Sequence, residues 1–149
     1  SMARQAGLPR QIVDFIVTHH GTSVISHFYQ LALQQQDNVN LADFRYPGPR
    51  PQTREQAIMM LADTVEATVR SKIQHGKVIG SRAVSGNGSG HLIEELVTSI
   101  VDERIRSGQL DECPLTLQDL TRIKQAFVAT LQGIYHPRVE YAPQMIKQT

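Results

Sequence analysis

Apolar residues recur at helical spacing in five segments of this chain, and no segment shows the alternation with a period of two that is typical of a strand. This pattern predicts an all-α fold. We expect about five main helices in a single domain that spans the whole chain. The predicted helices cover roughly residues 9–20, 23–34, 54–73, 91–107 and 117–135.

The breaks between these segments carry turn and capping signals. Gly21 is expected to end the first helix, and Thr22 or Ser23 to cap the second. Residues 44–51 contain three prolines and a glycine, so neither a helix nor a central strand can continue through them. The last helix begins with Thr116-Leu117-Gln118-Asp119, a recognisable N-terminal signal.

Composition excludes several classes of protein. The 149 residues include 15 basic and 14 acidic side chains, and this balance gives no case for DNA as a partner. The single cysteine cannot form an internal disulfide. No apolar run approaches the roughly 20 residues of a membrane helix.

The chain also reads as an excised piece of a longer protein. Ser1-Met2 is interpreted as a scar left by tag removal. Residues 74–90 end in a glycine- and serine-rich run, which predicts a flexible insertion without a catalytic role. Residues 142–149 are interpreted as a tail.

His19 and His20 are the first candidates for chemistry. Adjacent residues on a helix project about 100° apart. Such a pair reaches two ions of a binuclear centre, about 3.5–4 Å apart, more easily than it chelates one ion. The alternative is two solvated histidines, which the dipole favours at a helix C-terminus.

Asp63 is the second candidate, because it lies in a mostly apolar stretch and is expected to be at least partly buried. A buried carboxylate must be paired or bound to a metal. A salt bridge to an arginine is the alternative. Glu66 and Arg70 share the helix face of Asp63. They either hold the Asp63 carboxylate in place as a metal ligand or form a surface ion pair.

The proline-rich run is the third candidate site. Arg45, Arg50 and Arg54 offer bidentate donors for phosphate, and Tyr46 offers a stacking face for a base. The alternative is a stiff connection with solvated arginines.

Taken together, these pieces resemble a known family, the HD domain of seven-transmembrane HD receptors, which are cyclic di-AMP phosphodiesterases of the PgpH type. The similarity covers residues 7 to about 142. The motifs that carry it are Thr18–Ser23, Phe44–Glu55, Met60–Ala67, Gly108–Thr116 and Gly133–Tyr141.

The resemblance implies a helical phosphohydrolase that binds two transition metals, usually iron or manganese, and opens cyclic di-AMP to a linear dinucleotide. It implies that His19, His20 and Asp63 are metal ligands, with Asp63 also catalytic. It assigns the nucleotide pocket to the loop that holds Arg45, Tyr46, Arg50 and Arg54. It places the domain on the cytoplasmic side of an inner-membrane parent protein.

The family's other ligands, an early His, a His-Asp pair and a further His, are expected before Gly7 and are absent from this sequence. We therefore expect weak or absent metal binding and little or no activity from this chain alone. The alternative class is a non-catalytic helical module that binds nucleotide or dimerises. We also expect self-association, because the apolar faces led by Ile12, Phe15 and Ile16, and by Val24, Ile25 and Phe28, would be exposed.

Overall fold

The computed structural model describes residues 2–74 and 88–135, and these residues confirm the all-α prediction. Within them no strand forms, and Val24 and Arg45 make only an isolated antiparallel bridge. The elements in chain order are α1 (Met2–Gln5), α2 (Arg10–Thr18), α3 (Ser26–Gln35), the 3-10 helix η1 (Leu41–Phe44), α4 (Arg54–Gln74), α5 (Gly88–Arg106) and α6 (Leu117–Ile134).

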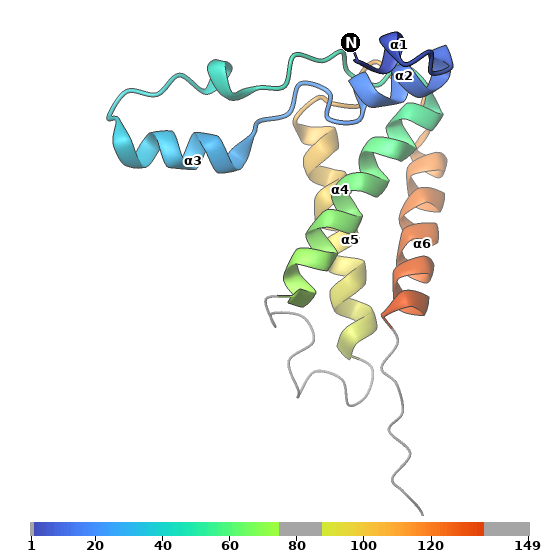
Figure 1. Cartoon of the computed structure of the whole chain (residues 1–149). Helices are drawn as coiled ribbons and strands as arrows, with labels where there is room; N and C mark the ends of the chain where they lie inside the picture. The colour runs from blue at the N-terminus through green and yellow to red at the C-terminus, as the bar shows by residue number, and fades with distance from the viewer. Residues whose placement is uncertain (1, 75–87, 136–149) are drawn as a thin grey trace, which may run out of the picture.

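The core lies where α4, α5 and α6 pack side by side, as Figure 1 shows. Each of these helices turns one apolar stripe inward, and the three stripes meet. Burying one large aliphatic side chain contributes about 1.5–3 kcal/mol. The buried residues of this core are Ala57, Met60, Leu61, Val65, Val69, Ile93, Val97, Ile100, Val101, Leu110, Ile123 and Leu131.

Side-chain caps fix where two of the core helices begin. Thr116 and Asp119 form a reciprocal capping box at the start of α6, as the sequence predicts. At the start of α4, Thr53 Oγ1 accepts the backbone N–H of Gln56 at 3.2 Å. These local signals explain why both helices begin where the sequence places them.

The predicted N-cap of the second helix is wrong. That helix, α3, begins at Ser26, and residues 22–25 are non-helical and pair with the proline-rich run. Ile25 N–H donates to the Phe44 carbonyl at 2.7 Å, and Tyr46 N–H donates to the Ser23 carbonyl at 2.9 Å. The β-branched residues of this segment favour an extended backbone, which these bonds hold against the run.

Helix α3 stands beside the bundle together with η1, the only helical element of the described chain that it contacts (Figure 1). It buries none of its residues, and Phe28 is 59% exposed. Ile12 and Ile16 on α2 are also exposed. The expected exposure is confirmed for these three side chains, whereas Phe15, Val24 and Ile25 are half-buried.

The predicted insertion and tail lie mainly outside the described residues. At the edges of the predicted insertion, Gln74 still belongs to α4, and residues 88–90 already belong to α5. Helices therefore extend further into this region than the sequence predicts. Within the described ranges, no helix combines the length and apolar character that crossing a membrane requires.

Candidate metal site

His19, His20 and Asp63 converge, as expected. Each offers a ligand atom, and these atoms all lie within 4.8 Å of one another. The histidines follow the end of α2, whereas Asp63 projects from the middle of α4. The packing of α2 against α4 brings them together, across more than 40 residues of sequence.

The two imidazole rings lie close together at the end of α2. Helix α2 ends at Thr18, so His19 is its C-cap and His20 lies in the following turn. The ring centroids are 3.9 Å apart, with the planes tilted by 40°. This close approach puts both imidazoles within reach of a single ion, an arrangement that the helical projection alone disfavours.

A hydrogen bond fixes the tautomer of His19. Its Nδ1 lies 2.9 Å from the carbonyl oxygen of Ile16. A carbonyl only accepts, so Nδ1 carries a proton, and in the neutral ring this leaves the Nε2 lone pair for a metal. Metal-binding histidines usually show this arrangement, with the second ring nitrogen donating to a carbonyl or a carboxylate.

The surroundings of His20 favour its neutral form by lowering its pKa. Its ring stacks on that of Tyr46 with centroids 4.2 Å apart. Burial lowers the pKa of His20 most, the neighbouring His19 and then Arg104 lower it further, and the Asp63 carboxylate opposes them. A neutral imidazole is the form that binds a metal.

Asp63 is exposed, so the expectation of partial burial is wrong. Leu61 and Val65, two residues away on either side, are both buried. Successive residues turn by about 100°, so Asp63 points some 200° away from each of them. The same exposure leaves its carboxylate free to meet the histidines.

Glu66 and Arg70 form the surface pair that was the alternative prediction. Arg70 Nη1 lies 3.0 Å from Glu66 Oε1, and both side chains are more than half exposed. Exposed pairs of this kind contribute at most about 1 kcal/mol. Because Glu66 and Arg70 pair with each other, the structure does not favour a role for them in supporting Asp63.

Gln109 is a site residue that sequence reasoning missed. It follows the glycine that ends α5, and its side chain is only 1% exposed. Its Oε1 accepts the backbone N–H of Thr22 at 2.9 Å. Gly21 makes this approach possible, because a Cβ there would lie 2.5 Å from Oε1. The only sequence signal was its place in the Gly108–Thr116 motif.

Two of the predicted phosphate-binding arginines contact the same turn. Arg45 Nη1 donates to the Thr22 carbonyl at 3.0 Å, and Arg50 Nε donates to Thr22 Oγ1 at 3.4 Å. Thr22, which follows the His-His-Gly sequence, is therefore held by the side chains of Gln109, Arg45 and Arg50. Tyr46, stacked on His20, belongs to the same group.

Arg54 points elsewhere. Its Nε donates to the Pro114 carbonyl at 3.0 Å and lies 4.0 Å from the Asp119 carboxylate. It therefore ties the start of α4 to the start of α6. The structure brings Arg45, Tyr46 and Arg50 to the histidines but leaves Arg54 with the α6 capping box.

The three converging residues fit a transition metal. Two imidazole nitrogens and one carboxylate oxygen suit the iron, manganese and zinc class of ions. Bonds to such ions are about 2.0–2.2 Å long, so small side-chain rotations bring the ligand atoms around one ion. In the described part of the chain, this is the one group of histidine, cysteine and acidic residues with such geometry.

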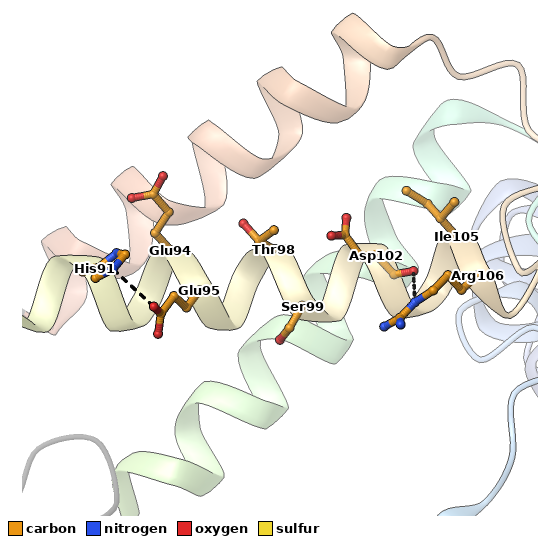
Figure 2. Close-up of a pocket in the computed structure, with 8 residues that line it drawn as sticks. All are labelled: His91, Glu94, Glu95, Thr98, Ser99, Asp102, Ile105 and Arg106. Atoms are coloured by element: carbon orange, nitrogen blue, oxygen red, sulfur yellow. Dashed lines mark hydrogen bonds and ion pairs between the residues drawn. The ribbon is translucent and has the colours of Figure 1, made fainter.

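A separate groove of about 800 Å³ lies along α5 and includes none of these residues (Figure 2). His91 pairs with Glu95 at 3.2 Å there, and Arg106 bonds the backbone of Asp102. These groups satisfy one another along a single helix face. The candidate metal site therefore remains the group formed by His19, His20 and Asp63.

A helical bundle that brings two histidines after one helix to an aspartate on the next long helix agrees with the HD-type domain that the sequence resembles. The comparisons with known proteins support this class. The cyclic-di-AMP phosphodiesterase PgpH of Bacillus subtilis (strain 168) is 40% identical over 141 residues, 95% of this chain. Its namesake from Listeria monocytogenes (serotype 1/2a, strain 10403S) is 37% identical over 90% of this chain.

A solved structure agrees with these relatives. The L. monocytogenes PgpH HD domain in complex with cyclic-di-AMP matches with a TM-score of 0.77 and 36% identity, covering 94% of this chain and 60% of that one. This chain spans 18% and 17% of the two curated relatives. No protein-family model matches it. The predicted resemblance is confirmed, and the chain is a homologue of part of the PgpH HD domain.

Proposed function

We propose that this chain is part of a metal-dependent phosphodiesterase that opens cyclic di-AMP to a linear dinucleotide. The observation that carries the proposal is the convergence of His19, His20 and Asp63 within 4.8 Å. The fold around them is similar to an HD domain solved with cyclic-di-AMP.

In this proposal His19 Nε2, a ring nitrogen of His20 and the Asp63 carboxylate hold a divalent iron or manganese ion. A bound transition metal supplies Lewis-acid polarisation of a phosphodiester. The His19 hydrogen bond to Ile16 orients its ring for this role, and Tyr46 restricts His20 by stacking. Asp63, a ligand on this account, is also the proposed catalytic residue.

The three loop arginines differ in how directly each would contact a nucleotide in the proposed pocket. Arg45 is exposed, and the N–H groups beyond its bond to Thr22 can meet a phosphate. Arg50 sits against the same threonine, half-buried. The Tyr46 ring, which is half-buried, would offer a base its stacking surface. Arg54 contributes indirectly, by fixing the end of the loop.

Three ligands make only part of a binuclear centre. We infer that residues elsewhere in a longer protein complete it, and that the 149-residue chain alone binds metal weakly and hydrolyses little. We also propose that the longer protein is anchored in the inner membrane with this domain in the cytoplasm. Both inferences rest on the resemblance.

The second candidate function is a self-associating module. The observation in its favour is the exposed apolar surface of Ile12 and Ile16 on α2 and Phe28 on α3. We propose that a second copy covers it, as symmetric association commonly does. Light scattering across a dilution series tests this, because a particle that is monomeric at every concentration contradicts self-association.

The test of the phosphodiesterase is turnover of cyclic di-AMP by the complete protein loaded with manganese. Replacing His20 or Asp63 with alanine is expected to lower turnover by about tenfold to a hundredfold or more. His27→Ala is the matched control, because His27 is exposed on α3 and outside the converging group. Wild-type turnover in both H20A and D63A would contradict the proposal.

A further inference from the structure

Residues 107–116 connect α5 to α6 and contact both parts of the proposed site. They include the Gly108–Thr116 motif, on which the family resemblance partly rests. Near the start of this connection, Gln109 accepts the backbone N–H of Thr22 and so holds the turn after the histidines. Its later residues bind the loop of residues 45–54, the proposed nucleotide pocket. One short segment thus sets the position of the loop relative to the histidines.

Two bonds to backbone carbonyls tie the far end of the loop to this connection. Cys113 Sγ donates to the Pro51 carbonyl at 3.0 Å, and the Pro114 carbonyl accepts Arg54 Nε at 3.0 Å. The Pro51 side chain is fully buried. Because the two bonds lie close together along both segments, they fix the course of the main chain where the loop enters α4.

A third contact leads from the connection to the Arg50 side chain. The Glu112 carboxylate accepts the side-chain amide of Gln52. The same amide nitrogen donates to the Arg50 carbonyl at 3.1 Å, since its two hydrogens serve two acceptors. Arg50 Nε in turn donates to Thr22 Oγ1 at 3.4 Å. A continuous series of hydrogen bonds therefore runs from Glu112 to the turn after the histidines.

The Arg50 guanidinium carries a charge that no carboxylate of the described residues neutralises. Arg50 forms no ion pair with them, although its side chain is half-buried. Its Nη1 lies against the connection, 3.9 Å from where a Cβ on Gly108 would stand. A cation without an anionic partner favours an anionic ligand, and the planar guanidinium suits phosphate. The placement of Arg50 therefore matters for binding a phosphodiester.

We propose that Glu112 is a positioning residue, which acts through the Gln52 side chain to place Arg50 against a phosphate of the cyclic dinucleotide. This inference rests on the proposed phosphodiesterase function. It gives the Gly108–Thr116 motif a role in substrate binding. Glu112 is not one of the candidate metal ligands, so its effect falls on substrate affinity rather than on the chemical step.

The competing role for Glu112 is a tether that only stabilises the fold. Glu112 and Gln52 are both exposed, and an exposed contact contributes little to stability. Glu112→Ala removes the acceptor of the Gln52 amide. Glu112→Gln removes the charge but keeps an oxygen that can accept the same amide. Glu94→Ala is the control for loss of an exposed carboxylate elsewhere, on α5.

The experiment measures KM and kcat for cyclic di-AMP in the manganese-loaded complete protein, together with Tm. E112A is expected to raise KM by about threefold to tenfold, with kcat and Tm unchanged, because a misplaced guanidinium loses part of a charged hydrogen bond. E112Q and E94A are expected to keep the wild-type KM. In an R50A background, E112A is expected to raise KM no further, because the group that it positions is gone.

A wild-type KM in E112A would overturn the inference, and so would an equal rise in KM when E112A is added to R50A. A second readout needs no substrate: the NMR signal of the Arg50 Nε–H in the metal-free chain is expected to shift in E112A and to stay in E112Q. An identical signal in wild type and E112A would also contradict positioning. If wild type does not cleave cyclic di-AMP, the proposed function fails, and the NMR comparison still decides whether Glu112 positions Arg50.

Discussion

Gln109 accepts the backbone N–H of Thr22 across 87 residues of sequence, and this bond locks the end of the three-helix core to the turn that carries the histidines. The Gln109 side chain is fully buried, and its amide also donates to Thr22 Oγ1 at 3.2 Å and to the Ser107 carbonyl at 3.4 Å. The position of His20 therefore depends on a glutamine that is no candidate ligand.

Gln109→Leu is expected to lower the free energy of unfolding by about 1–3 kcal/mol, because the Thr22 N–H loses its acceptor while the side-chain volume is kept. Thermal and denaturant unfolding measure this loss. Faster amide hydrogen exchange at Thr22 locates it. Gln125→Leu is the matched control, since Gln125 is exposed on α6. Equal stability of Q109L and Q125L would show that the bond is dispensable.

Tyr46→Ala is expected to raise the pKa of His20 toward its ordinary value. Burial is the largest cause of the lowered pKa, and the Tyr46 ring covers one face of the imidazole. With that ring removed, His20 protonates at a higher pH, so metal binding also fails at a higher pH. NMR titration of the histidine ring protons in the metal-free protein measures the shift.

Tyr29→Ala serves as the control for this titration, because the Tyr29 ring packs against Phe44 rather than against a histidine. Its effect on His20 is expected to be small. An unchanged pKa in Y46A would mean that burial by other groups holds His20 neutral.

Asp119→Asn is expected to destabilise the protein near neutral pH and to lose this effect in acid. The backbone and side-chain hydrogen bonds from Thr116, and to a lesser extent Arg54, hold the pKa of Asp119 below its ordinary value. Its stabilising contribution is therefore complete above the unfolded-state pKa of about 3.9 and is lost as pH falls through the lower folded-state pKa.

The measurement compares the Tm of wild type and D119N from neutral to strongly acidic pH. Asp37→Asn, which removes an exposed carboxylate after α3, controls for net charge. A difference between wild type and D119N that stays constant across the acid range would contradict the assignment to the ionised capping box.

The three core helices could be predicted from sequence because their signals are local. The stripes of α4, α5 and α6 and the Thr116–Asp119 box lie within single segments, so periodicity and capping reveal them. The convergence of the histidines with Asp63 was also expected, through the resemblance.

The turn after α2 could not be predicted, because distant partners determine it. Threonine is a common N-cap residue, yet the polar groups of Thr22 form hydrogen bonds with Gln109, Arg45 and Arg50 instead. No local pattern contains these contacts. The exposure of Asp63, by contrast, follows from its angular position relative to Leu61, and the helical spacing was available in the sequence.

The most direct test of this account is anomalous diffraction at the manganese edge, from crystals of the complete protein grown with manganese. We predict a peak within about 2.0–2.3 Å of His19 Nε2, a ring nitrogen of His20 and an Asp63 carboxylate oxygen. The H20A variant is expected to lose or weaken that peak. Manganese bound elsewhere, with no peak among these three side chains, would contradict the assignment of the site.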